Sequence, residues 1–505
     1  MQNTGVKELI ILGGGTAGWM TAAMLSRIFR DKLSITLVES DEIATIGVGE
    51  ASIPPLVDFN RGLGLDEREF ITRTQATIKL GIEFTGWGSS SAQYMHAFGS
   101  IGKRFGFCDF HHVWQHAQQM AEQHGTAKSA LWDYSLNYRA AKAGRFAHLP
   151  VIPNTRLPGL EYAYHFDAGL YAKLLKEVAQ KQGVIRTEGK VTEVKLDQQT
   201  GEVSELVMHD GACLSADMFI DCSGLSAMLI DKTLNVGFDD WSHWLACDSA
   251  FAIPTEHGDV PLLPYTQSIA HGAGWQWRIP LQHRVGNGLV FASRFCSEAQ
   301  AREVLLSNLQ GKPLDEPRLI RFKTGMRRKQ WHKNVFAIGL SSGFLEPLES
   351  TSIHLIQSAI MRLIRHFPVS KQPDMQREAC NSEFSQEMKQ IRDFIILHYK
   401  ATKRDDTAFW RWCKDMEVPK SLEQRLALFQ QSGAVMRDEG NLFSDLAWQQ
   451  VMLGQGIAPG ALHPLALQFS HEQASDLLDS LETLIQHTVD QLPTHQAFIN
   501  NMTQK

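Results

Sequence analysis

The first forty residues pass from an apolar stretch through glycines to a helical pattern. Leu9–Leu12 is a short apolar run, as expected of a strand buried in a parallel sheet. The letters GGGTAG follow at 13–18, and the apolar residues beyond them recur at helical spacing as far as Ile28. A second apolar run, LSITLVES, ends at Glu39. The pattern predicts a strand, a tight turn, a helix and a second, parallel strand.

The glycines of this turn have the spacing of a dinucleotide-binding fingerprint. The first glycine allows the turn, the second lets a pyrophosphate approach the backbone, and the third lets the helix pack on the strand. An acidic residue at the end of the second strand binds ribose hydroxyls, and no arginine stands beside Glu39 in the sequence to favour a 2′-phosphate. The predicted cofactor contacts here are Gly13, Gly15, Thr16, Ala17, Gly18 and Glu39.

Two later segments resemble further parts of the same cofactor domain. Residues 189–224 alternate like a β-meander and close with an apolar strand that ends at Asp221. Residues 334–360 read as a strand, a turn and a long helix. With a single fingerprint and no second GxGxxG, this order resembles the glutathione-reductase-type FAD fold. Further FAD contacts are expected at Val191, Asp221, Gly339 and Leu340.

Helical spacing returns after residue 370 and suggests a second module. We predict an α/β fold in which a discontinuous FAD-binding module comprises residues 1–95 and 160–370. A mostly helical substrate-binding module would comprise residues 96–159 and 371–505. A chain of 505 residues exceeds what one hydrophobic core usually organises.

The sequence GWQWRIP at 274–280 places two tryptophans at strand spacing. Side chains two residues apart point to the same side of a strand, so Trp275 and Trp277 would form one wall. Large aromatic residues usually fill cores, so the pair is read either as core packing or as a wall that faces a cavity.

Composition excludes several classes of function. The net charge of −6 and the lack of a basic run argue against a nucleic-acid or anionic-membrane protein. The 7 cysteines are scattered without a CxxC pair, which favours a reduced, cytoplasmic protein and predicts no metal site. The N-terminus does not have the pattern of a secretion signal, and a homodimer is left open.

Several segments together resemble the flavin-dependent tryptophan halogenase family, in which WxWxIP is a marker beside the dinucleotide fingerprint. These segments cover most of the chain and are GGGTAGW, IGVGEASIPP, TIKLGIEFTGW, YHFDAGLYAKLL, GWQWRIP, AIGLSSGFLEPLEST and HYKATKRDDTAFWRWC. The resemblance implies an oxidoreductase that takes reduced FAD from a separate flavin reductase. It also implies that the enzyme uses O2 and chloride or bromide to form hypohalous acid, and halogenates an aromatic substrate.

The resemblance assigns Lys79 as the lysine that activates hypohalous acid and Glu349 as its partner carboxylate. From the residues alone, the alternation around Lys79 is typical of a strand with one solvated face. Glu349 directly precedes Ser-Thr, as in the family, whereas Glu346 does not. A glutamate near a helix start can also serve as a capping residue.

A halide site is predicted where the sequence turns into a helix. The helix expected from Ser352 onward has unsatisfied N–H groups at its start, which attract anions. The family resemblance assigns the halide to the backbone of Thr351 and Ser352. The better-known free-tryptophan halogenases have glycine where this chain has Ser352.

The substrate residues match the family less closely. His96, Phe98 and Trp448 are the candidates for contact with an aromatic ring, although each also suits a packed core. No tyrosine follows Tyr399, so the tyrosine clamp of free-tryptophan halogenases is missing. We therefore expect an indole or another electron-rich aromatic, either small or part of a larger molecule.

Two other functions are weighed against halogenation. A flavin-dependent aromatic hydroxylase would use the same cofactor, but many of those enzymes carry Gly-Asp where this chain reads AIGLSS. A halogenase-like flavoprotein without turnover is the non-enzymatic alternative, and the presence of Lys79 and Glu349 argues against it. In a halogenase, Trp275, Trp277, Ile279 and Pro280 would line the tunnel wall between flavin and substrate.

Overall fold

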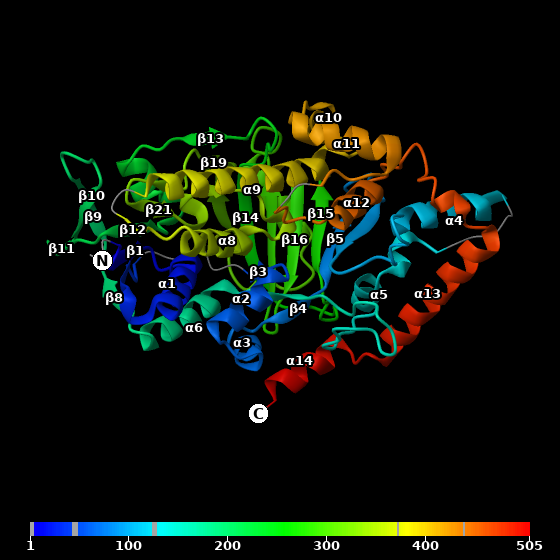
Figure 1. Ribbon diagram of the computed structural model, residues 1–505, viewed down its shortest axis with the longest axis horizontal. Coiled ribbons are helices and arrows are strands. Elements are labelled where there is room, and N and C mark those ends of the chain that lie inside the picture. The colour runs from blue at the N-terminus through cyan, green and yellow to red at the C-terminus, as the bar shows by residue number, and fades with distance from the viewer. Residues whose placement is uncertain (1–4, 43–48, 124–128, 371–372, 438–439, 505) are drawn as a thin grey trace. The chain divides into compact units, whose positions relative to one another are not determined.

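The computed structural model describes residues 5–42, 49–123, 129–370, 373–437 and 440–504 (Figure 1). The chain forms two compact units. Unit 1 consists of residues 1–76, 166–248 and 320–389, and unit 2 of residues 77–165, 249–319 and 390–505. The predicted modules place 77–95 and 249–319 with the FAD-binding residues, whereas the compact units place both segments in unit 2.

Unit 1 is built on a mostly parallel sheet in the order β20-β21-β12-β1-β2-β8. Its strands are β1 (Glu8–Leu12), β2 (Ser34–Glu39), β8 (Ile185–Glu188), β12 (Met218–Asp221), β20 (Trp331–His332) and β21 (Val335–Ala337). Pairs β1–β2, β1–β12, β2–β8 and β12–β21 are parallel, so the predicted parallel arrangement is confirmed. The apolar run of β1 is buried from Leu9 to Leu12 because neighbouring strands and helices cover it.

Two small antiparallel sheets complete unit 1. The predicted meander is confirmed as the sheet β11-β10-β9, formed by β9 (Val191–Leu196), β10 (Val203–Met208) and β11 (Cys213–Leu214). The other sheet is formed by β13 (Phe238–Asp240), β19 (Gly325–Arg327) and β22 (Gly343–Phe344). The remaining elements are α1 (Thr16–Phe29), β3 (Gly49–Ala51), α2 (Pro55–Leu63), α3 (Glu67–Arg73), α6 (Ala168–Lys181) and α8 (Ser352–Arg365).

Three elements cross the boundary between the units. They are β7 (Ala163–Asp167), β18 (Arg318–Arg321) and the long helix α9 (Asp374–Lys400). No described helix is long and apolar enough to cross a membrane. Within the described ranges, no cluster of three or more His, Cys, Asp or Glu side chains has the arrangement of a metal site.

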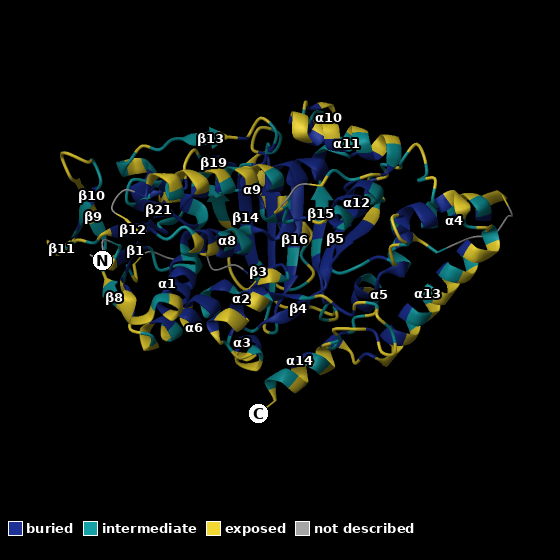
Figure 2. Cartoon of the chain, in the orientation of Figure 1, coloured by how far each residue is buried: buried dark blue, intermediate teal, exposed yellow. Residues whose placement is uncertain are grey.

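Unit 2 contains a larger, mostly antiparallel sheet, six strands of which run in the order β14-β17-β16-β15-β5-β6 (Figure 1). They are β5 (Gly81–Thr85), β6 (Gln93–Ala97), β14 (Ser249–Thr255), β15 (Thr266–His271), β16 (Gly274–Pro280) and β17 (Val285–Phe291). The short strand β4 (Thr77–Lys79) pairs separately with β7. The central strands of the sheet are buried along most of their length (Figure 2).

Helices make up most of the rest of unit 2, as predicted for residues after 370. They are α4 (Phe110–Gln123), α5 (Leu136–Lys142), α7 (Glu298–Ser307), α10 (Ala408–Asp415), α11 (Lys420–Ser432), α12 (Asp445–Gly454), α13 (His471–Gln491) and α14 (His495–Thr503). Several begin at a residue whose side chain accepts a hydrogen bond from the first turn, as Ser470 does from the N–H of Gln473. These caps explain why the helices start where they do.

The predicted strand at 274–280 is confirmed as β16, and it lies between β15 and β17. The register places Trp277 opposite Gly288 of β17. A Cβ added to Gly288 would lie 2.0 Å from the indole carbon Cζ2 of Trp277 and 2.6 Å from the carbonyl oxygen of Phe251. The glycine therefore leaves the space that the Trp277 indole fills.

We predict that Gly288→Ala destabilises the protein by about 1–3 kcal/mol, because the added methyl group overpacks the sheet against the Trp277 indole. Urea unfolding followed by tryptophan fluorescence measures the change. Gly272→Ala, in the turn before β16, is the matched control, since its Cβ would meet only the Thr407 methyl at 3.6 Å. Equal stability of the two variants would contradict the prediction.

Candidate active site

Unit 1 positions the glycine fingerprint at the junction of β1 and α1. Gly13 has φ +116°, and a Cβ there would lie 2.2 Å from the carbonyl oxygen of Cys222. A Cβ on Gly18 would lie 1.9 Å from the carbonyl oxygen of Gly13. Gly15 is the N-cap of α1 and provides no side-chain cap, so the N–H groups of Thr16 and Ala17 are available to a phosphate. This is the geometry that the fingerprint predicts.

Glu39 ends β2 directly beneath the fingerprint turn. A Cβ on Gly14 would lie 1.6 Å from its Oε2 atom. The carboxylate accepts hydrogen bonds from Trp19 at 3.2 Å, Lys176 at 2.8 Å and Arg186 at 2.5 Å. Burial opposes ionisation, but these hydrogen bonds outweigh it and hold the pKa of Glu39 below its ordinary value.

The arginine beside Glu39 could not be seen in the sequence. Arg186 belongs to β8, which pairs with β2 in parallel register and so brings the guanidinium to the end of that strand. The argument against a 2′-phosphate from the absence of a neighbouring arginine therefore does not hold. The Arg186 guanidinium forms ion pairs with Glu39 and Asp41.

Asp221 lies at the end of β12 and is completely buried. Its carboxylate accepts hydrogen bonds from the backbone N–H and hydroxyl of Ser223 and from the N–H groups of Leu229 and Ile230. Those four bonds use the acceptor sites of the carboxylate. Asp221 therefore holds the loop after β12, and its direct contact with FAD stays a prediction.

The other predicted cofactor residues occupy two different places in unit 1. Val191 begins β9 and packs against the apolar cluster beside the parallel sheet. Gly339 and Leu340 form a helical turn after β21, where Gly339 has φ +76°. A Cβ on Gly339 would lie 2.9 Å from the Ala17 side chain, so this glycine lets the turn approach the start of α1.

The predicted halide residues lie at the start of α8, which begins at Ser352 as predicted. Pro347–Glu349 forms a helical turn, and Ser350 follows in the left-handed conformation with φ +59°. Thr351 is the N-cap of α8 and makes no side-chain cap bond. Its buried hydroxyl has no hydrogen-bond partner among the described residues. Glu346 and Glu349 are both buried.

Lys79 lies in unit 2 at the end of β4 and has a fractional exposure of 0%. The expectation of one solvated strand face is wrong: Thr77, Lys79 and Glu83 are all buried. The strand breaks at Leu80, so β4 and β5 pair with different partners and both of their faces are covered. The Lys79 ammonium lies 5.3 Å from the centre of the Phe98 ring.

Lys79 and the predicted substrate residues make two separate contacts, one at the Phe98 ring and one at the Phe394 ring. The N–H of Phe98 bonds to the carbonyl of Leu80, which brings Phe98 next to Lys79. His96 packs edge-on against Phe394, with ring centres 5.7 Å apart, and Trp448 packs against the same ring at 4.9 Å. Phe394 also stacks on Phe443. The sequence did not single out either residue, because Phe394 has the helical spacing of an ordinary core residue in α9 and Phe443 lies in the loop before α12.

The two tryptophans of β16 are both buried, as a core pair would be. Their ring centres are 6.1 Å apart, and Trp275 also packs near Trp87. Ile279 is buried and Pro280 ends the strand. The Pro280 carbonyl accepts a hydrogen bond of 2.6 Å from the hydroxyl of Thr77, which connects the end of this strand to the strand of Lys79.

Comparison with known proteins decides the family. The tryptophan halogenase family model matches residues 8–471. The chain belongs to the tryptophan halogenase family.

Solved and curated relatives agree over nearly the whole length. The flavin-dependent halogenase Xcc4156 from Xanthomonas campestris shares 47% identity with a TM-score of 0.93, covering 98% of each chain. The flavin-dependent halogenase BrvH from Brevundimonas sp. BAL3 shares 40% identity with a TM-score of 0.93, covering 99% of each chain. Tryptophan 6-halogenase SttH from Streptomyces toxytricini is 32% identical, covering 99% of this chain and 98% of its own.

This tryptophan halogenase family member is therefore an oxidoreductase that uses FAD and halide. Unit 1 contains the residues predicted to hold both: the fingerprint, Glu39 and the start of α8. Unit 2 contains Lys79, the aromatic candidates and the two tryptophans. The motif IGVGEASIPP lies in part outside the described residues, at positions 46–48.

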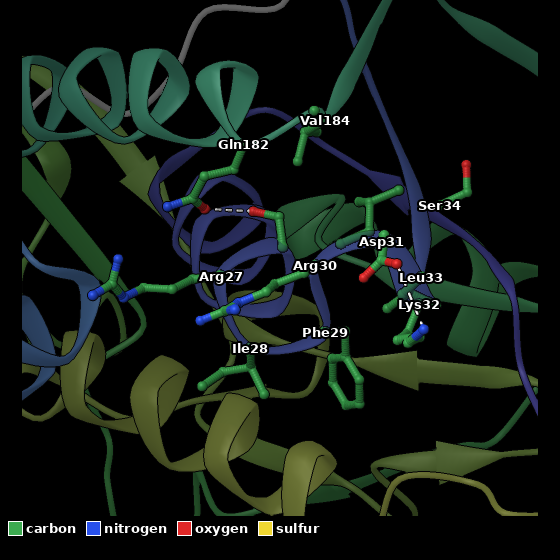
Figure 3. A pocket seen from close by; sticks show the side chains of 13 residues that line it. Arg27, Ile28, Phe29, Arg30, Asp31, Lys32, Leu33, Ser34, Gln182 and Val184 are labelled. Atoms are coloured by element: carbon green, nitrogen blue, oxygen red, sulfur yellow. Dashed lines mark hydrogen bonds and ion pairs between the residues drawn. The ribbon is translucent and has the colours of Figure 1, made fainter.

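One large cavity of this halogenase is remote from the fingerprint. It has a volume of about 1070 Å³ and is lined by residues 26–35 and 182–184 (Figure 3). These residues surround the C-terminal end of α1, about 20 Å along the helix from its phosphate-binding start. Ser26 and Gln182, both in the lining, are hydrogen-bonded to each other at 2.8 Å. Gln182 lies apart from the Asp31–Lys32 ion pair (Figure 3). This cavity is therefore not the cofactor site.

A smaller cavity of about 210 Å³ lies in unit 2. It is lined by residues 100–102, 104, 109–111, 131, 445–446 and 449–450. The Gln450 amide bonds to both the N–H and the carbonyl of Ala97, each at 3.0 Å. Gln450 thus connects the lining of this cavity to β6, the strand of His96.

Sequence reasoning missed the histidines that surround β4. His495 accepts a hydrogen bond of 3.1 Å from the N–H of Ile78 through Nε2, and His165 bonds to Thr77. Both histidines are buried and come from segments far away along the chain. The letters YHFD in the segment that begins at Tyr164 resembled the family, but no signal in the sequence placed His495 here.

We predict that His495 makes the stability of the protein depend on acid pH. Burial lowers the pKa of His495 from 6.5 to about 4, so the unfolded chain binds a proton at a pH where the folded chain does not. Above pH 6.5, His495 is neutral in both the folded and the unfolded chain. As the pH falls from 6.5 toward 4, only the unfolded chain gains the proton, so the free energy of unfolding decreases. At pH 4.5 the decrease amounts to about 2–3 kcal/mol relative to pH 7.

Urea unfolding at pH 7 and pH 4.5 tests this expectation with His495→Gln, whose amide oxygen can still accept the bond from Ile78. The wild type should lose about 2–3 kcal/mol more than the variant over this interval. An equal loss in both proteins would refute the role of His495.

Proposed function

We propose that this halogenase uses O2, reduced FAD and chloride or bromide to halogenate an indole or another electron-rich aromatic ring. The observation that carries the proposal is Lys79, an ammonium group with 0% exposure beside the Phe98 ring. A charged amine is costly to bury and does not add to core packing. Its place beside the predicted substrate residues supports a role in the reaction.

The residues of unit 1 fit FAD. The three fingerprint glycines leave room for a pyrophosphate at the start of α1, and Glu39 ends the adjacent strand. When bound and reduced, FAD would supply the electrons with which O2 and halide yield hypohalous acid. The chain has a single fingerprint, which supports delivery of reduced FAD by a separate reductase.

In this proposal, the Lys79 ammonium donates a hydrogen bond to hypohalous acid and polarises it toward the aromatic ring. The ring carbon takes the halogen, the hydroxide that is left takes a proton from the ammonium and departs as water, and the ring proton passes to a carboxylate. Glu349 is the proposed acceptor, and its burial favours an acceptor that is shielded from bulk water. Trp275 and Trp277 would separate the organic substrate from the flavin.

The substrate is proposed to be indole-like, as the names of relatives such as SttH indicate for those enzymes. His96, Phe98 and Trp448 supply aromatic surface, and the cavity of about 210 Å³ has room for a substituent or a larger body. The missing tyrosine clamp argues against dependence on the amino-acid group of free tryptophan.

The test supplies the protein with FAD, a flavin reductase, NADH, bromide or chloride, and a panel of indoles and phenols. We expect brominated or chlorinated products by mass spectrometry. Hydroxylated products that form without halide would support a hydroxylase. FAD binding without any modified product from the panel would contradict the proposed function.

Lys79→Met should reduce product formation by at least about 100-fold, because it removes the proton donor while keeping the side-chain length. FAD binding, followed by flavin fluorescence, should be unchanged. Lys173→Ala, at an exposed position of α6, is the control and should keep full activity. Halogenation by Lys79→Met at the wild-type rate would exclude the proposed role of this lysine.

The halide proposal predicts opposite effects of Ser352→Asp on stability and on halide use. Aspartate in the first turn of α8 interacts favourably with the helix dipole, by about 0.3–1 kcal/mol, and so preserves folding. The same charge repels a halide at this helix start, and we expect the KM for bromide to rise by about tenfold or more. The control is Ser352→Asn, because asparagine has the shape of aspartate without its charge. It should leave the KM for bromide within about twofold of wild type. A wild-type KM in Ser352→Asp would place the halide elsewhere.

A further inference from the structure

Strand β4 is held by a chain of hydrogen bonds whose donors and acceptors can be assigned. The Thr77 hydroxyl lies 2.6 Å from the Pro280 carbonyl and 3.1 Å from Nδ1 of His165. Nε2 of His165 lies 2.9 Å from the hydroxyl of Thr266. His165 and Thr77 have 0% exposure, so water does not compete for these bonds.

The single proton of the Thr77 hydroxyl determines the direction of the chain. A carbonyl oxygen only accepts, so the proton of Thr77 must point to Pro280. The Thr77 oxygen is then an acceptor for His165, whose Nδ1 carries the proton. The remaining ring nitrogen, Nε2, accepts from the Thr266 hydroxyl in the neutral imidazole.

The surroundings of His165 favour this neutral form. Burial, and after it the charge of Lys79, lowers the pKa of His165 well below its ordinary value. His495 is itself neutral with the proton on Nδ1, because Nε2 accepts from Ile78 and Nδ1 lies 2.9 Å from the carbonyl of Leu262. Neither histidine therefore adds a positive charge beside Lys79.

The chain of bonds joins three segments that matter to the proposed reaction. Thr77 and Lys79 are two residues apart in β4 and so lie on the same side of the strand. Pro280 ends β16, the strand of the two tryptophans, and Thr266 begins β15, which pairs with β16. In the register of β4 and β7, His165 lies opposite Thr77 and the small residue Ala163 lies opposite Lys79.

We propose that His165 is a positioning residue that, through the Thr77 hydroxyl, fixes the Lys79 ammonium relative to the end of the tryptophan strand β16. This inference rests on the proposed function of Lys79 as the group that activates hypohalous acid. An ammonium that donates a hydrogen bond to a small reagent must be placed within a fraction of an ångström, and a displacement of about 1 Å can cost 100-fold in rate.

The two ring nitrogens can be tested separately. In His165→Asn the amide nitrogen takes the place of Nδ1 and can donate to Thr77. In His165→Gln the amide lies near the place of Nε2, where it can bond only to Thr266. His165→Leu removes both bonds. Thr77→Val removes the hydroxyl of Thr77 without changing the side-chain volume, whereas Thr77→Ser keeps the hydroxyl.

We expect His165→Asn and Thr77→Ser to keep kcat within about fivefold of the wild type, and His165→Gln, His165→Leu and Thr77→Val to lose about tenfold or more. The KM for bromide should stay unchanged, because the hydrogen bonds of His165 and Thr77 do not involve the proposed halide residues Thr351 and Ser352. The fraction of reduced FAD that yields halogenated product should fall with kcat, while FAD binding stays constant.

Crystal structures of Thr77→Val and Thr77→Ser without substrate give a readout that does not depend on turnover. We expect the Lys79 ammonium to leave its place 5.3 Å from the Phe98 ring centre in the valine variant and to keep it in the serine variant. If His165→Leu does not fold, this pair of Thr77 variants still decides the question.

Three outcomes separate this inference from the proposed function. No halogenated product from the wild type contradicts the proposed function itself. An active wild type with equally active Thr77→Val and His165→Leu variants overturns the positioning role alone. Equal losses in His165→Asn and His165→Leu would also overturn it, because the Nδ1 donor would then have no special importance.

Discussion

The burial of the Lys79 ammonium is the constraint on which the arrangement of unit 2 depends. A charged amine without solvent contact must be held in place by its surroundings, since an ammonium gains free energy in any position that water reaches. Strand β4 meets this demand although it is only three residues long. It pairs with β7 along one edge, bonds to His495 through Ile78, and bonds to Pro280 through Thr77.

Neutral histidines suit this position better than positively charged residues would. A second cation beside Lys79 would raise the cost of burying its charge. His165 and His495 provide hydrogen bonds to β4 without adding such a charge, because burial keeps both imidazoles neutral at pH 7. The strand of Lys79 is therefore held by hydrogen bonds from neutral side chains.

In unit 1, close backbone approach leaves helix starts that suit anions. Its glycines are required by contacts of about 2 Å that a side chain would make with neighbouring carbonyl oxygens, and the result is a helix start without a side-chain cap. A second helix start, at Ser352, follows a left-handed residue and also lacks a side-chain cap. Each of the two helix starts carries partial positive charge. The first suits a pyrophosphate and the second a halide, and both ligands are negatively charged although they differ in size.

The sequence by itself determined the features that depend on local pattern. The βαβ fingerprint, the start of α8 at Ser352 and the strand at 274–280 follow from periodicity and glycine spacing, which act over a few neighbouring residues. The motifs also identified the family, because several short segments matched together. The positions of Lys79 and Glu349 came from that match and not from periodicity.

Only the tertiary structure decided the surroundings of those residues. Alternation predicted a solvated face for Lys79, yet the break at Leu80 separates two strands with different partners and buries both faces. Arg186 reaches Glu39, and His495 reaches Ile78, only because strand pairing and helix packing bring distant segments together. Local pattern records which side of a strand a residue occupies, whereas the chain's long-range contacts decide what covers that side.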